Sequence, residues 1–464
     1  MTTDPTNERL QKEEGSVRTV DPREARRVVI SSAIGTTIEF YDFSLYGLAA
    51  ALVFGPQFFS SENPATAQLA ALATFSIGFF FRPIGGIIAG HFGDRIGRKT
   101  VMLWSFMLMG TSTLLVAFLP TYASIGVVAP LLLVLLRAVQ GLAAGAEWSG
   151  AALMAVEHAP VNKRGLYGSA PAFGTSAGSL LASSVFLIVS LVNKDAFVSF
   201  GWRFAFGISF VLVAYGFYLR RRVTESPLFE EAWKHEPPRV PLAVVLRSHP
   251  IAVLRTISWV LVSGATGYIV NTYGVSFAVK NTGASQAAVL GLLNGAIVLD
   301  ILALLIVGRL YDRHRRPVLI TAALVQIPAA ILLFPLLSLG TLASTGLAFA
   351  LVWIGVGIIE CTRGALISDL FPVEIRYTGM ALSYNLAYVL AGLAPLVAAA
   401  IVGSTGSITW MVVILAVISL IALPTAFVPP RAEPIKLVEE DSSVAAARPG
   451  RSQGVGKVGF TRRG

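Results

Sequence analysis

Two carboxylates interrupt an otherwise apolar stretch near the start of the chain. Glu39 and Asp42 stand within residues 34–54, IGTTIEFYDFSLYGLAAALVF. Residues three apart share one face of a helix, so the two acids are predicted to project together. Close, buried carboxylates repel each other when both are ionised, which favours a neutral form. The pair is therefore predicted to be a proton-coupling site. It is open which member holds the proton, and whether Asp42 instead bonds the backbone or a neighbouring helix.

Further charged and polar residues fall inside apolar stretches. Arg137 stays charged at any relevant pH and can grip a carboxylate through two hydrogen bonds, so it is a candidate substrate clamp or a permanent partner of Asp42. Gln140, one turn along, is placed to donate to a substrate hydroxyl or carbonyl. Glu360 and Arg363, also one turn apart, are predicted to pair and to extend the pocket. The other candidate substrate-binding residues are Tyr46, Tyr384 and Asn385. All of these groups could instead be structural pairs.

For these roles, the surrounding segments of the chain must exclude water. Only 13% of the 464 residues are charged, about half of the roughly 25% found in soluble proteins. A span of about 20 apolar residues crosses a bilayer, and the sequence contains twelve candidates. They are residues 28–54, 66–90, 100–120, 126–153, 165–192, 202–220, 250–279, 286–308, 317–338, 342–368, 378–403 and 408–428. The sequence predicts an all-α membrane protein with twelve transmembrane helices.

The distribution of basic residues predicts the topology. Most of the 36 lysines and arginines lie in alternate hydrophilic segments, including both ends of the chain and the 220–249 loop. By the positive-inside rule these segments face the cytoplasm, so both termini are expected there, in a multi-pass protein of the plasma (inner) membrane. The net charge of +10 is then explained without a nucleic-acid partner.

Enzyme and metal sites are not expected. The single cysteine, Cys361, excludes an internal disulfide and gives no metal-binding pattern. No metalloprotease, nucleotide-binding or nucleophile-elbow motif stands in a suitable context. Without a nucleotide site, we expect an ion gradient rather than ATP or a cofactor to supply energy.

The chain is built from two similar halves. GHFGDRIGRK (90–99) resembles GRLYDRHRRP (308–317), and EHAPVNKRG (157–165) resembles DLFPVEIRY (369–377), at nearly one offset. A duplicated six-helix unit places a substrate site between the repeats. The predicted parts are a cytoplasmic tail (1–27), a six-helix bundle (28–220), a cytoplasmic linker (221–249), a second bundle (250–428) and a cytoplasmic C-terminal tail (429–464). The C-terminal tail is rich in Pro, Gly, Arg and Ser and is predicted to be disordered.

The stretch FRPIGGIIAGHFGDRIGRK (81–99) resembles the loop between helices 2 and 3 of the major facilitator superfamily. IEFYDFSLYG, RAVQGLAAGAEWSGA, VTESPLF and LFPVEIRYTGMALSYN are similar to the metabolite:proton symporter branch, with a lean toward its shikimate-carrier-like subgroup. The chain departs from that subgroup early in helix 7, at Val260 and Ser263, and in helix 10, at Cys361, Thr362 and Arg363. The substrate is therefore not carried over.

The resemblance implies a monomeric carrier that works by alternating access. Helices 1 and 4 would line the central cavity and bring Arg137 near Asp42. Charged residues at the cytoplasmic helix ends would lock that side when it is closed. These candidate gating residues are Asp94, Arg95, Arg98, Glu147, Glu157, Arg164, Asp312, Arg313 and Arg376.

The function expected is proton-coupled import of a small organic acid, because two arginines, Arg137 and Arg363, suit an anion. Two alternatives stay open. One is a proton symporter for a zwitterionic osmolyte such as proline or betaine, with Phe40, Tyr41, Tyr46 and Trp148 as an aromatic box. The other is a proton-driven exporter, which the same fold supports.

Overall fold

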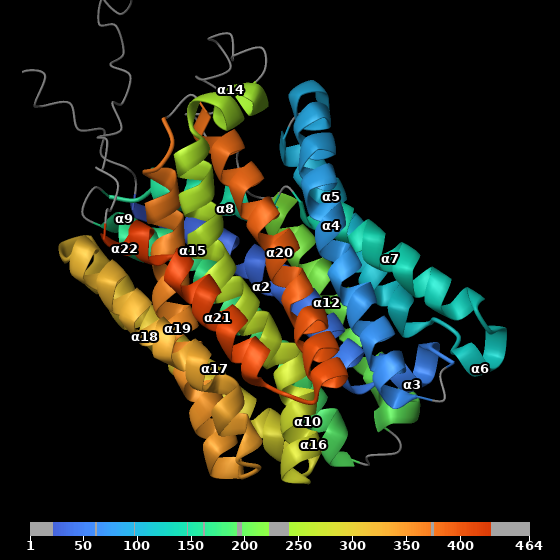
Figure 1. Cartoon of the computed structure of the whole chain (residues 1–464). Helices are drawn as coiled ribbons and strands as arrows, with labels where there is room; N and C mark the ends of the chain where they lie inside the picture. The colour runs from blue at the N-terminus through green and yellow to red at the C-terminus, as the bar shows by residue number, and fades with distance from the viewer. Residues whose placement is uncertain are drawn as a thin grey trace, which may run out of the picture. The chain divides into compact units, whose positions relative to one another are not determined.

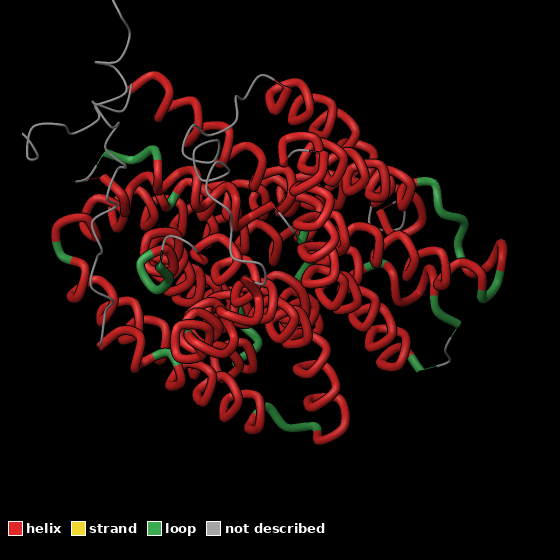
Figure 2. Tube along the Cα trace, turned by 90° about the horizontal axis from the view of Figure 1, so that it is seen from above, coloured by secondary structure: helices red, strands yellow, loops and turns green. Residues whose placement is uncertain are grey.

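The computed structural model describes residues 22–60, 63–96, 98–145, 147–160, 163–192, 197–221, 241–372 and 375–427. These residues form helices joined by short loops and no strand, as Figures 1 and 2 show. A helix satisfies its own backbone hydrogen bonds, which is the condition for crossing a bilayer. The all-α prediction is confirmed for this part of the chain. Most of the predicted tails and linker lies outside the described residues.

The N-terminal half contains the first six helical passes. Most correspond to one predicted span, although three are divided by a break or an irregular turn. Their bounds are α2 (Pro22–Leu52), α4 (Pro64–Ile96), α5 (Arg98–Ala117), α7 (Val128–Ala144) with α8 (Glu147–Glu157), α9 (Arg164–Gly168) with α10 (Ala170–Val192), and the π-helical η2 (Phe197–Gly201) with α12 (Trp202–Arg221). Two short helices, α3 (Phe54–Phe58) and α6 (Tyr122–Ile125), lie between passes.

The C-terminal half contains the other six passes. It begins with the short α14 (Pro241–Ser248), inside the predicted linker. The passes are α15 (Pro250–Ile269) with the π-helical η3 (Val270–Gly274) and α16 (Val275–Thr282), α17 (Gln286–Arg313), α18 (Arg315–Ser338), α19 (Leu342–Ser368), α20 (Arg376–Thr405), and α21 (Thr409–Ile421) with α22 (Leu423–Phe427). Ten stretches of the described chain are long and apolar enough to span a membrane. Helices α2 and α5 supply the other two predicted spans.

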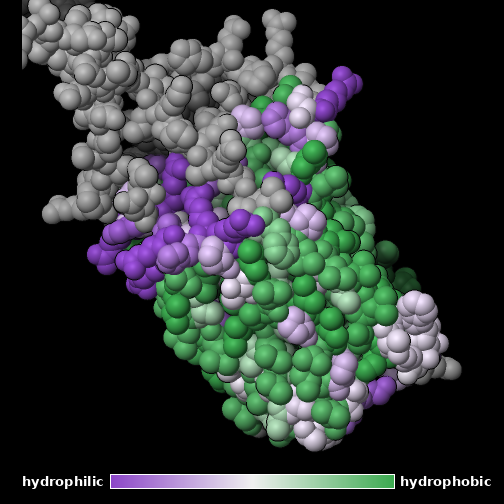
Figure 3. Space-filling view, turned by 60° about the vertical axis from the view of Figure 1, so that its left-hand side comes forward, coloured by the Kyte–Doolittle hydropathy of each residue, from purple (hydrophilic) through white to green (hydrophobic). Residues whose placement is uncertain are grey.

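The two halves meet along several helices. α10 packs against α17, α4 against α20, and α2 against η3. In Figure 1 α9, α14 and α22 lie toward one end of the passes, and α3, α6 and α16 toward the other. We call the first the basic end, because it carries Arg313, Arg315 and Arg316 at the α17–α18 junction. Figure 3 shows a broad hydrophobic surface with hydrophilic residues gathered at one end, as a bilayer requires.

Glycines bring α4 and α7 into close contact. A Cβ atom added at Gly141 would lie 2.0 Å from the carbonyl oxygen of Gly78, and one added at Gly145 would lie 2.0 Å from that of Arg82. Gly141, Gly145 and Ser149 recur every four residues, a small-residue stripe that predicts close helix packing. The structure identifies the partner as α4, the helix that carries Arg82.

This contact gives a first prediction. Gly141→Ala should destabilise the protein by about 1–3 kcal/mol, since the backbone of α4 must move. Gly295→Ala is the matched control, because a Cβ at Gly295 meets nothing within 4 Å. Thermal unfolding of the purified protein in detergent should show a lower Tm for the first variant only. Equal Tm values would contradict the close contact.

Candidate functional site

Asp42, in α2, has a hydrogen-bond donor on each carboxylate oxygen. Thr113 Oγ1 on α5 donates to Oδ2 at 2.9 Å, and Ser209 Oγ on α12 donates to Oδ1 at 3.0 Å. The Asp42 side chain is only 2% exposed, so these hydroxyls replace the water that a carboxylate needs. In this conformation Asp42 thus bonds neighbouring helices, the alternative that its sequence context left open.

A chain of hydrogen bonds leads from Asp42 to Arg137. Gln140 Nε2 donates to Thr113 Oγ1 at 2.8 Å, and Arg137 Nη1 donates to Gln140 Oε1 at 3.2 Å. Thr113 therefore accepts from Gln140 while it donates to Asp42. Within the described part of the chain, Arg137 and Asp42 form no direct ion pair. The predicted clamp and the predicted proton carrier are connected, but through two neutral side chains.

Arg137 is enclosed by aromatic rings. Its guanidinium carbon lies 4.4 Å from the ring centres of both Phe43 and Tyr46, and Nε donates to the Phe75 carbonyl oxygen at 3.3 Å. Gly78 leaves room for it, because a Cβ there would lie 2.5 Å from Nε. Nη2 has no hydrogen-bond partner among the described residues. That N–H group is the part of Arg137 that a further acceptor could use.

Glu39 has a different partner from Asp42. Arg82 Nη2 on α4 lies 2.7 Å from Glu39 Oε1, and both side chains are fully buried. The Arg82 guanidinium carbon also lies 5.0 Å from the Phe43 ring centre and 5.2 Å from that of Tyr388. The two acids of α2 are thus held by different helices, so their mutual repulsion does not organise this site. Helical periodicity predicted their shared face but not the pairing with Arg82.

The predicted pair in the C-terminal half is confirmed. Arg363 Nη2 lies 2.7 Å from Glu360 Oε1, one turn away on α19. Arg363 Nη1 also donates to the Tyr388 hydroxyl of α20 at 3.0 Å. Its guanidinium carbon lies 5.5 Å from the ring centre of Trp148, which belongs to the other half. Arg363 therefore joins an ion pair, a tyrosine and an aromatic face at the boundary between the bundles.

Two predicted substrate-binding residues connect the halves in this conformation. Tyr384 stacks on Trp148 with ring centres 3.7 Å apart and planes 4° from parallel. Asn385 Nδ2 donates to the Gly145 carbonyl oxygen at 2.8 Å. Gly145 directly follows α7, where carbonyl groups lose their intrahelical donors. Both side chains of α20 thus close the boundary instead of facing a cavity.

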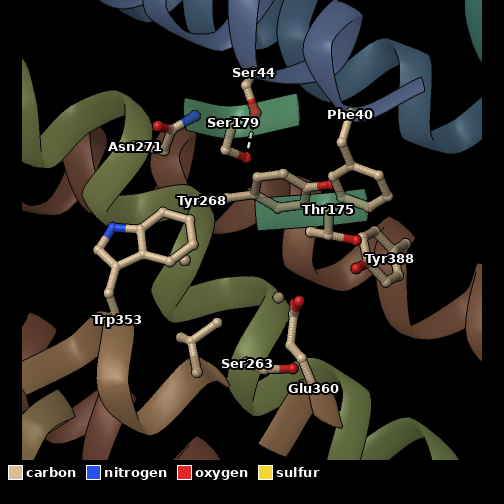
Figure 4. A pocket seen from close by; sticks show the side chains of 13 residues that line it. Phe40, Ser44, Thr175, Ser179, Ser263, Tyr268, Asn271, Trp353, Glu360 and Tyr388 are labelled. Atoms are coloured by element: carbon tan, nitrogen blue, oxygen red, sulfur yellow. Dashed lines mark hydrogen bonds between the residues drawn. The ribbon is translucent and has the colours of Figure 1, made fainter. Parts of the chain in front are cut away.

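A small cavity lies between the two halves, and Figure 4 shows the side chains around it. Its volume is about 20 Å³, room for a single water molecule. Aromatic rings and hydroxyl groups dominate the lining, including a hydrogen bond between Ser44 and Ser179 at 2.8 Å. The lining residues are Phe40, Ser44, Thr175, Ser179, Ser263, Gly264, Gly267, Tyr268, Asn271, Trp353, Val356, Glu360 and Tyr388.

This lining differs from the substrate-binding set predicted from the sequence. Of that set, only Glu360 lines the cavity among the described residues. The other lining residues are mostly small, hydroxyl or aromatic side chains, which carry no sign of their role in a hydrophobic sequence; of them, Phe40 was named for the osmolyte alternative. Asn271 reaches the cavity from η3, a π-helical turn within the seventh pass; such turns often occur at functional sites. A metabolite needs more space than this, so the helices must separate before it can bind.

At the basic end, Asp312 joins the two halves. Its carboxylate, in the last turn of α17, accepts hydrogen bonds from the backbone N–H groups of Gly165 (2.6 Å) and Leu166 (3.1 Å). These groups belong to the first turn of α9, where N–H groups lack intrahelical partners and favour negative charge. The arrangement fits the predicted gating role, which remains a prediction.

Asp369 forms a second charged cluster at this end. Arg315 Nη1 lies 2.6 Å from Asp369 Oδ2, and Arg164 and Arg376 also act on the carboxylate. Burial raises the pKa of Asp369 above its usual value, and Arg315 opposes that shift. Arg376 Nε also donates to the Phe371 carbonyl oxygen at 3.2 Å. Arg164 belongs to the other half, so this cluster too lies across the boundary.

The other predicted gating residues have varied positions. Glu147 is buried at the start of α8, Glu157 is half-buried at its end, and Arg313 is exposed beside Asp312. Three side chains lie outside the described residues, namely those of Asp94, Arg95 and Arg98.

Comparison with known proteins identifies the family. The sequence model of the Major Facilitator Superfamily matches residues 32–382 and 280–454. The chain belongs to this superfamily. An inner membrane metabolite transport protein of Escherichia coli (strain K12) is 41% identical over 80% of this chain and 87% of its own length. The shikimate transporter of the same strain is 38% identical over 82% and 88%. The proline/betaine transporter of Salmonella typhimurium (strain LT2) is 32% identical over 89% and 84%.

Solved structures show the same fold. A xylose transporter from Escherichia coli, in a partially occluded inward open conformation, has a TM-score of 0.68 at 17% identity, covering 89% of this chain and 99% of that one. The likeness shows the two-bundle fold. The family model and the metabolite transport relatives show that the chain is a secondary transporter and a multi-pass protein of the inner membrane. The family indicates a transporter rather than an enzyme.

The buried pair in the N-terminal bundle of this transporter gives a second prediction. Glu39→Gln leaves Arg82 charged and buried without its partner, and we expect a loss of about 3–5 kcal/mol of stability. Arg82→Met should cost a similar amount. The double variant should recover much of the loss, because no unpaired charge remains. Thermal unfolding of all four proteins completes the cycle; a double variant as unstable as the sum of the single ones would contradict the pairing.

The contact of Asp312 with α9 gives a third prediction. Cys361 is buried in a small cluster with Ala172 of α10 and Leu304 of α17, so its thiol becomes accessible when the bundles separate there. Asp312→Ala should raise the rate of Cys361 labelling by a maleimide several-fold at fixed pH. Arg309→Ala, a change at an exposed residue one turn earlier on α17, is the matched control. Rates are compared per thiolate, because the charge of Asp312 also acts on Cys361. Equal rates for both variants would show that Asp312 does not hold the basic end closed.

Proposed function

We propose that this transporter is a proton-coupled symporter that imports a small organic acid by alternating access, with a proton gradient as its energy source. The observation that carries the proposal is the continuous hydrogen-bond chain from Asp42 through Thr113 and Gln140 to Arg137. An acid that can change its protonation state is thereby connected to a cation that can hold an anion.

Asp42 is the proton carrier in this proposal. Glu39 is already neutralised by Arg82, whereas Asp42 is supported by hydroxyl groups, which can act as donors or acceptors. Thr113 Oγ1 also lies 3.0 Å from the Met109 carbonyl oxygen. When Asp42 takes up a proton, Thr113 can turn its hydrogen to Met109 and accept one from Asp42. Protonation then requires a hydroxyl rotation and no movement of a helix.

Proton uptake prepares Arg137 for an anion. While Asp42 is ionised, its charge partly balances that of Arg137 through the chain. A neutral Asp42 leaves the guanidinium uncompensated, with Nη2 unbonded, and a substrate carboxylate then binds more favourably. Because proton and anion each favour binding of the other, they are carried together. This reciprocity is the thermodynamic condition for symport.

Contacts between the bundles close the cavity at each of its two ends, so the cavity can open to one side of the membrane at a time. At the basic end Asp312 holds α9, and at the opposite end Gln68 Nε2 donates to Ser276 Oγ at 2.8 Å. Opening one boundary while the other stays closed gives alternating access by movement of one bundle against the other. Substrate and proton would enter from one side and leave to the other, in a single monomeric chain.

The residues that line the cavity suit a hydroxylated organic acid as the substrate. Ser44, Thr175, Ser179 and Ser263 offer hydroxyl groups, and apolar rings beside them suit a carbon ring. A shikimate-like carboxylate has both features, and a shikimate transporter is among the relatives.

One observation favours a second candidate. The cavity is also lined by the rings of Phe40, Tyr268 and Trp353 and by Glu360. Aromatic faces attract a quaternary ammonium group, and Glu360 Oε2, the oxygen that Arg363 does not bind, has no hydrogen-bond partner among the described residues. A zwitterionic osmolyte such as betaine or proline would fit this surface, and a proline/betaine transporter is among the relatives. Neither candidate fixes the direction of net flux, so proton-driven export remains an alternative.

Reconstitution gives the fourth prediction. Proteoliposomes containing a pH-sensitive dye would be supplied with shikimate, 2-oxoglutarate, citrate, benzoate, proline or betaine, with no imposed gradient. One organic acid should acidify the lumen faster than in protein-free liposomes. Asp42→Asn should abolish this acidification, because its side chain cannot take up a proton. Arg137→Gln should lower apparent affinity by roughly 10- to 100-fold, the loss of a charge-assisted hydrogen bond.

The controls separate the alternatives. Asp42→Asn should still exchange labelled for unlabelled substrate, since exchange moves no net proton. Acidification by betaine or proline alone would contradict the organic-acid assignment and support the osmolyte. Acidification that persists in Asp42→Asn would contradict the role of Asp42.

A further inference from the structure

Asp300 is a buried acid that the proposed mechanism does not use. It lies near the midpoint of α17, about 20 Å from either end at 1.5 Å per residue, and its side chain is fully buried. Gly357 on α19 makes room for it, because a Cβ there would lie 2.0 Å from Asp300 Oδ1. The carboxyl group is thus enclosed between α17, α19 and α10, where the two bundles meet.

Among the described residues, the carboxyl group has no cation paired with it. Neither oxygen accepts a hydrogen bond from a described residue. Ser176 of α10 lies beside it, and its hydroxyl can turn toward the carboxylate, although it donates here to the Ala172 carbonyl oxygen at 3.3 Å. Arg363 acts on Asp300 only at longer range, and it is already paired with Glu360 at 2.7 Å. No described cation therefore forms an ion pair with Asp300.

The other charged and titratable groups around Asp300 do not stabilise its ionised form. On α19 the titratable groups that face it are Glu360, Cys361 and Arg363, and the Glu360–Arg363 pair is neutral as a unit. α10 contains no titratable residue. α9, α16 and α18 also pack against α17, and their charged residues stand toward the two ends of that helix: Arg164, Lys280, Arg315 and Arg316.

These surroundings favour the neutral acid. A buried carboxylate without a paired cation, and with one hydroxyl at most as a donor, costs several kcal/mol. A protonated carboxyl group instead has one O–H to donate. The Ser176 oxygen beside it, whose own hydrogen points to Ala172, is an available acceptor. Ser176 can therefore satisfy the neutral form, whereas the anion has no charged partner.

We propose that Asp300 is a second proton-binding site, which holds a proton while the bundles are closed and releases it when α10 and α17 separate and water enters. The site is distinct from Asp42, which lies wholly within the N-terminal bundle. It depends on the proposed function only in requiring that the bundles separate, and it needs no particular substrate.

Separation of the two bundles then depends on pH. If the closed conformation binds the Asp300 proton more tightly than the open one, raising the pH favours opening, by up to tenfold per pH unit while the group titrates. Asn at this position keeps the shape of the neutral acid and cannot ionise. Asp300→Asn should therefore remain closed where the unmodified protein opens.

The test measures labelling of Cys361, the single cysteine of the chain, in the full-length protein without substrate. Its thiol stands next to Asp300 along the α10–α17–α19 boundary. Labelling by N-ethylmaleimide accelerates with pH for any thiol, because the thiolate is the nucleophile. The ratio of unmodified protein to Asp300→Asn removes the ordinary titration of the thiol, since both carry Cys361 and Asp312. The charge of an ionised Asp300 disfavours the neighbouring thiolate and would lower this ratio, so a rise reports opening. We expect the ratio to rise at least several-fold between pH 5 and 9.

A ratio that rises in the background of Asp42→Asn as well as in the unmodified protein supports a site separate from Asp42. A constant ratio, or a rise that Asp42→Asn abolishes, overturns the proposal. Asp300→Ser, also unable to ionise, replaces the Asn variant if that one does not purify as a folded protein. Because no substrate is present, failure of this test leaves the symport assay unaffected, and the reverse holds too.

Discussion

Charged groups in the membrane interior cannot be hydrated, and this constraint organises the helices around them. A charge at the bilayer centre costs at least about 2.5–3.5 kcal/mol, so each one needs a polar partner on another turn or helix. Asp42 takes hydroxyls from α5 and α12, and Glu39 takes Arg82 from α4. These contacts connect α2 to three other helices of its bundle. The charges thus contribute to the internal rigidity of the bundle as well as to a site.

Away from the charged contacts of the basic end, the boundary between the bundles is built from weaker contacts. The pairs Glu39–Arg82 and Glu360–Arg363 each lie within one bundle. Across the boundary stand a neutral bond from Asn385 to the Gly145 carbonyl, another from Ser76 to the Gly392 carbonyl, and the Trp148–Tyr384 stack. A neutral hydrogen bond contributes only about 0.5–1.5 kcal/mol. The bundles can therefore separate by exchanging such bonds without breaking a buried ion pair.

The sequence predicted the helices and their grouping into two bundles better than it predicted the contacts between side chains. Apolar spans and the two repeated motifs were enough for twelve helices in two bundles, because length and hydropathy determine what crosses a membrane. The Glu360–Arg363 pair was predictable since its members are one turn apart. The partners of Glu39 and Asp42 were not, because helical periodicity gives the face of a residue and not the helix opposite. The cavity lining was missed for a similar reason: Tyr268 and Trp353 look like ordinary apolar positions in their helices.

The two bundles have similar folds, but their buried acids have different partners. The acids of α17 illustrate the difference. The acids of α2 are satisfied within their own bundle, so movement of the other bundle need not disturb them. Asp312 and Asp300, both on α17, face groups of the N-terminal bundle, namely the first turn of α9 and Ser176 of α10. Separation of the bundles changes the surroundings of both acids at once. α17 is therefore the helix through which protonation and movement of the C-terminal bundle are most directly connected.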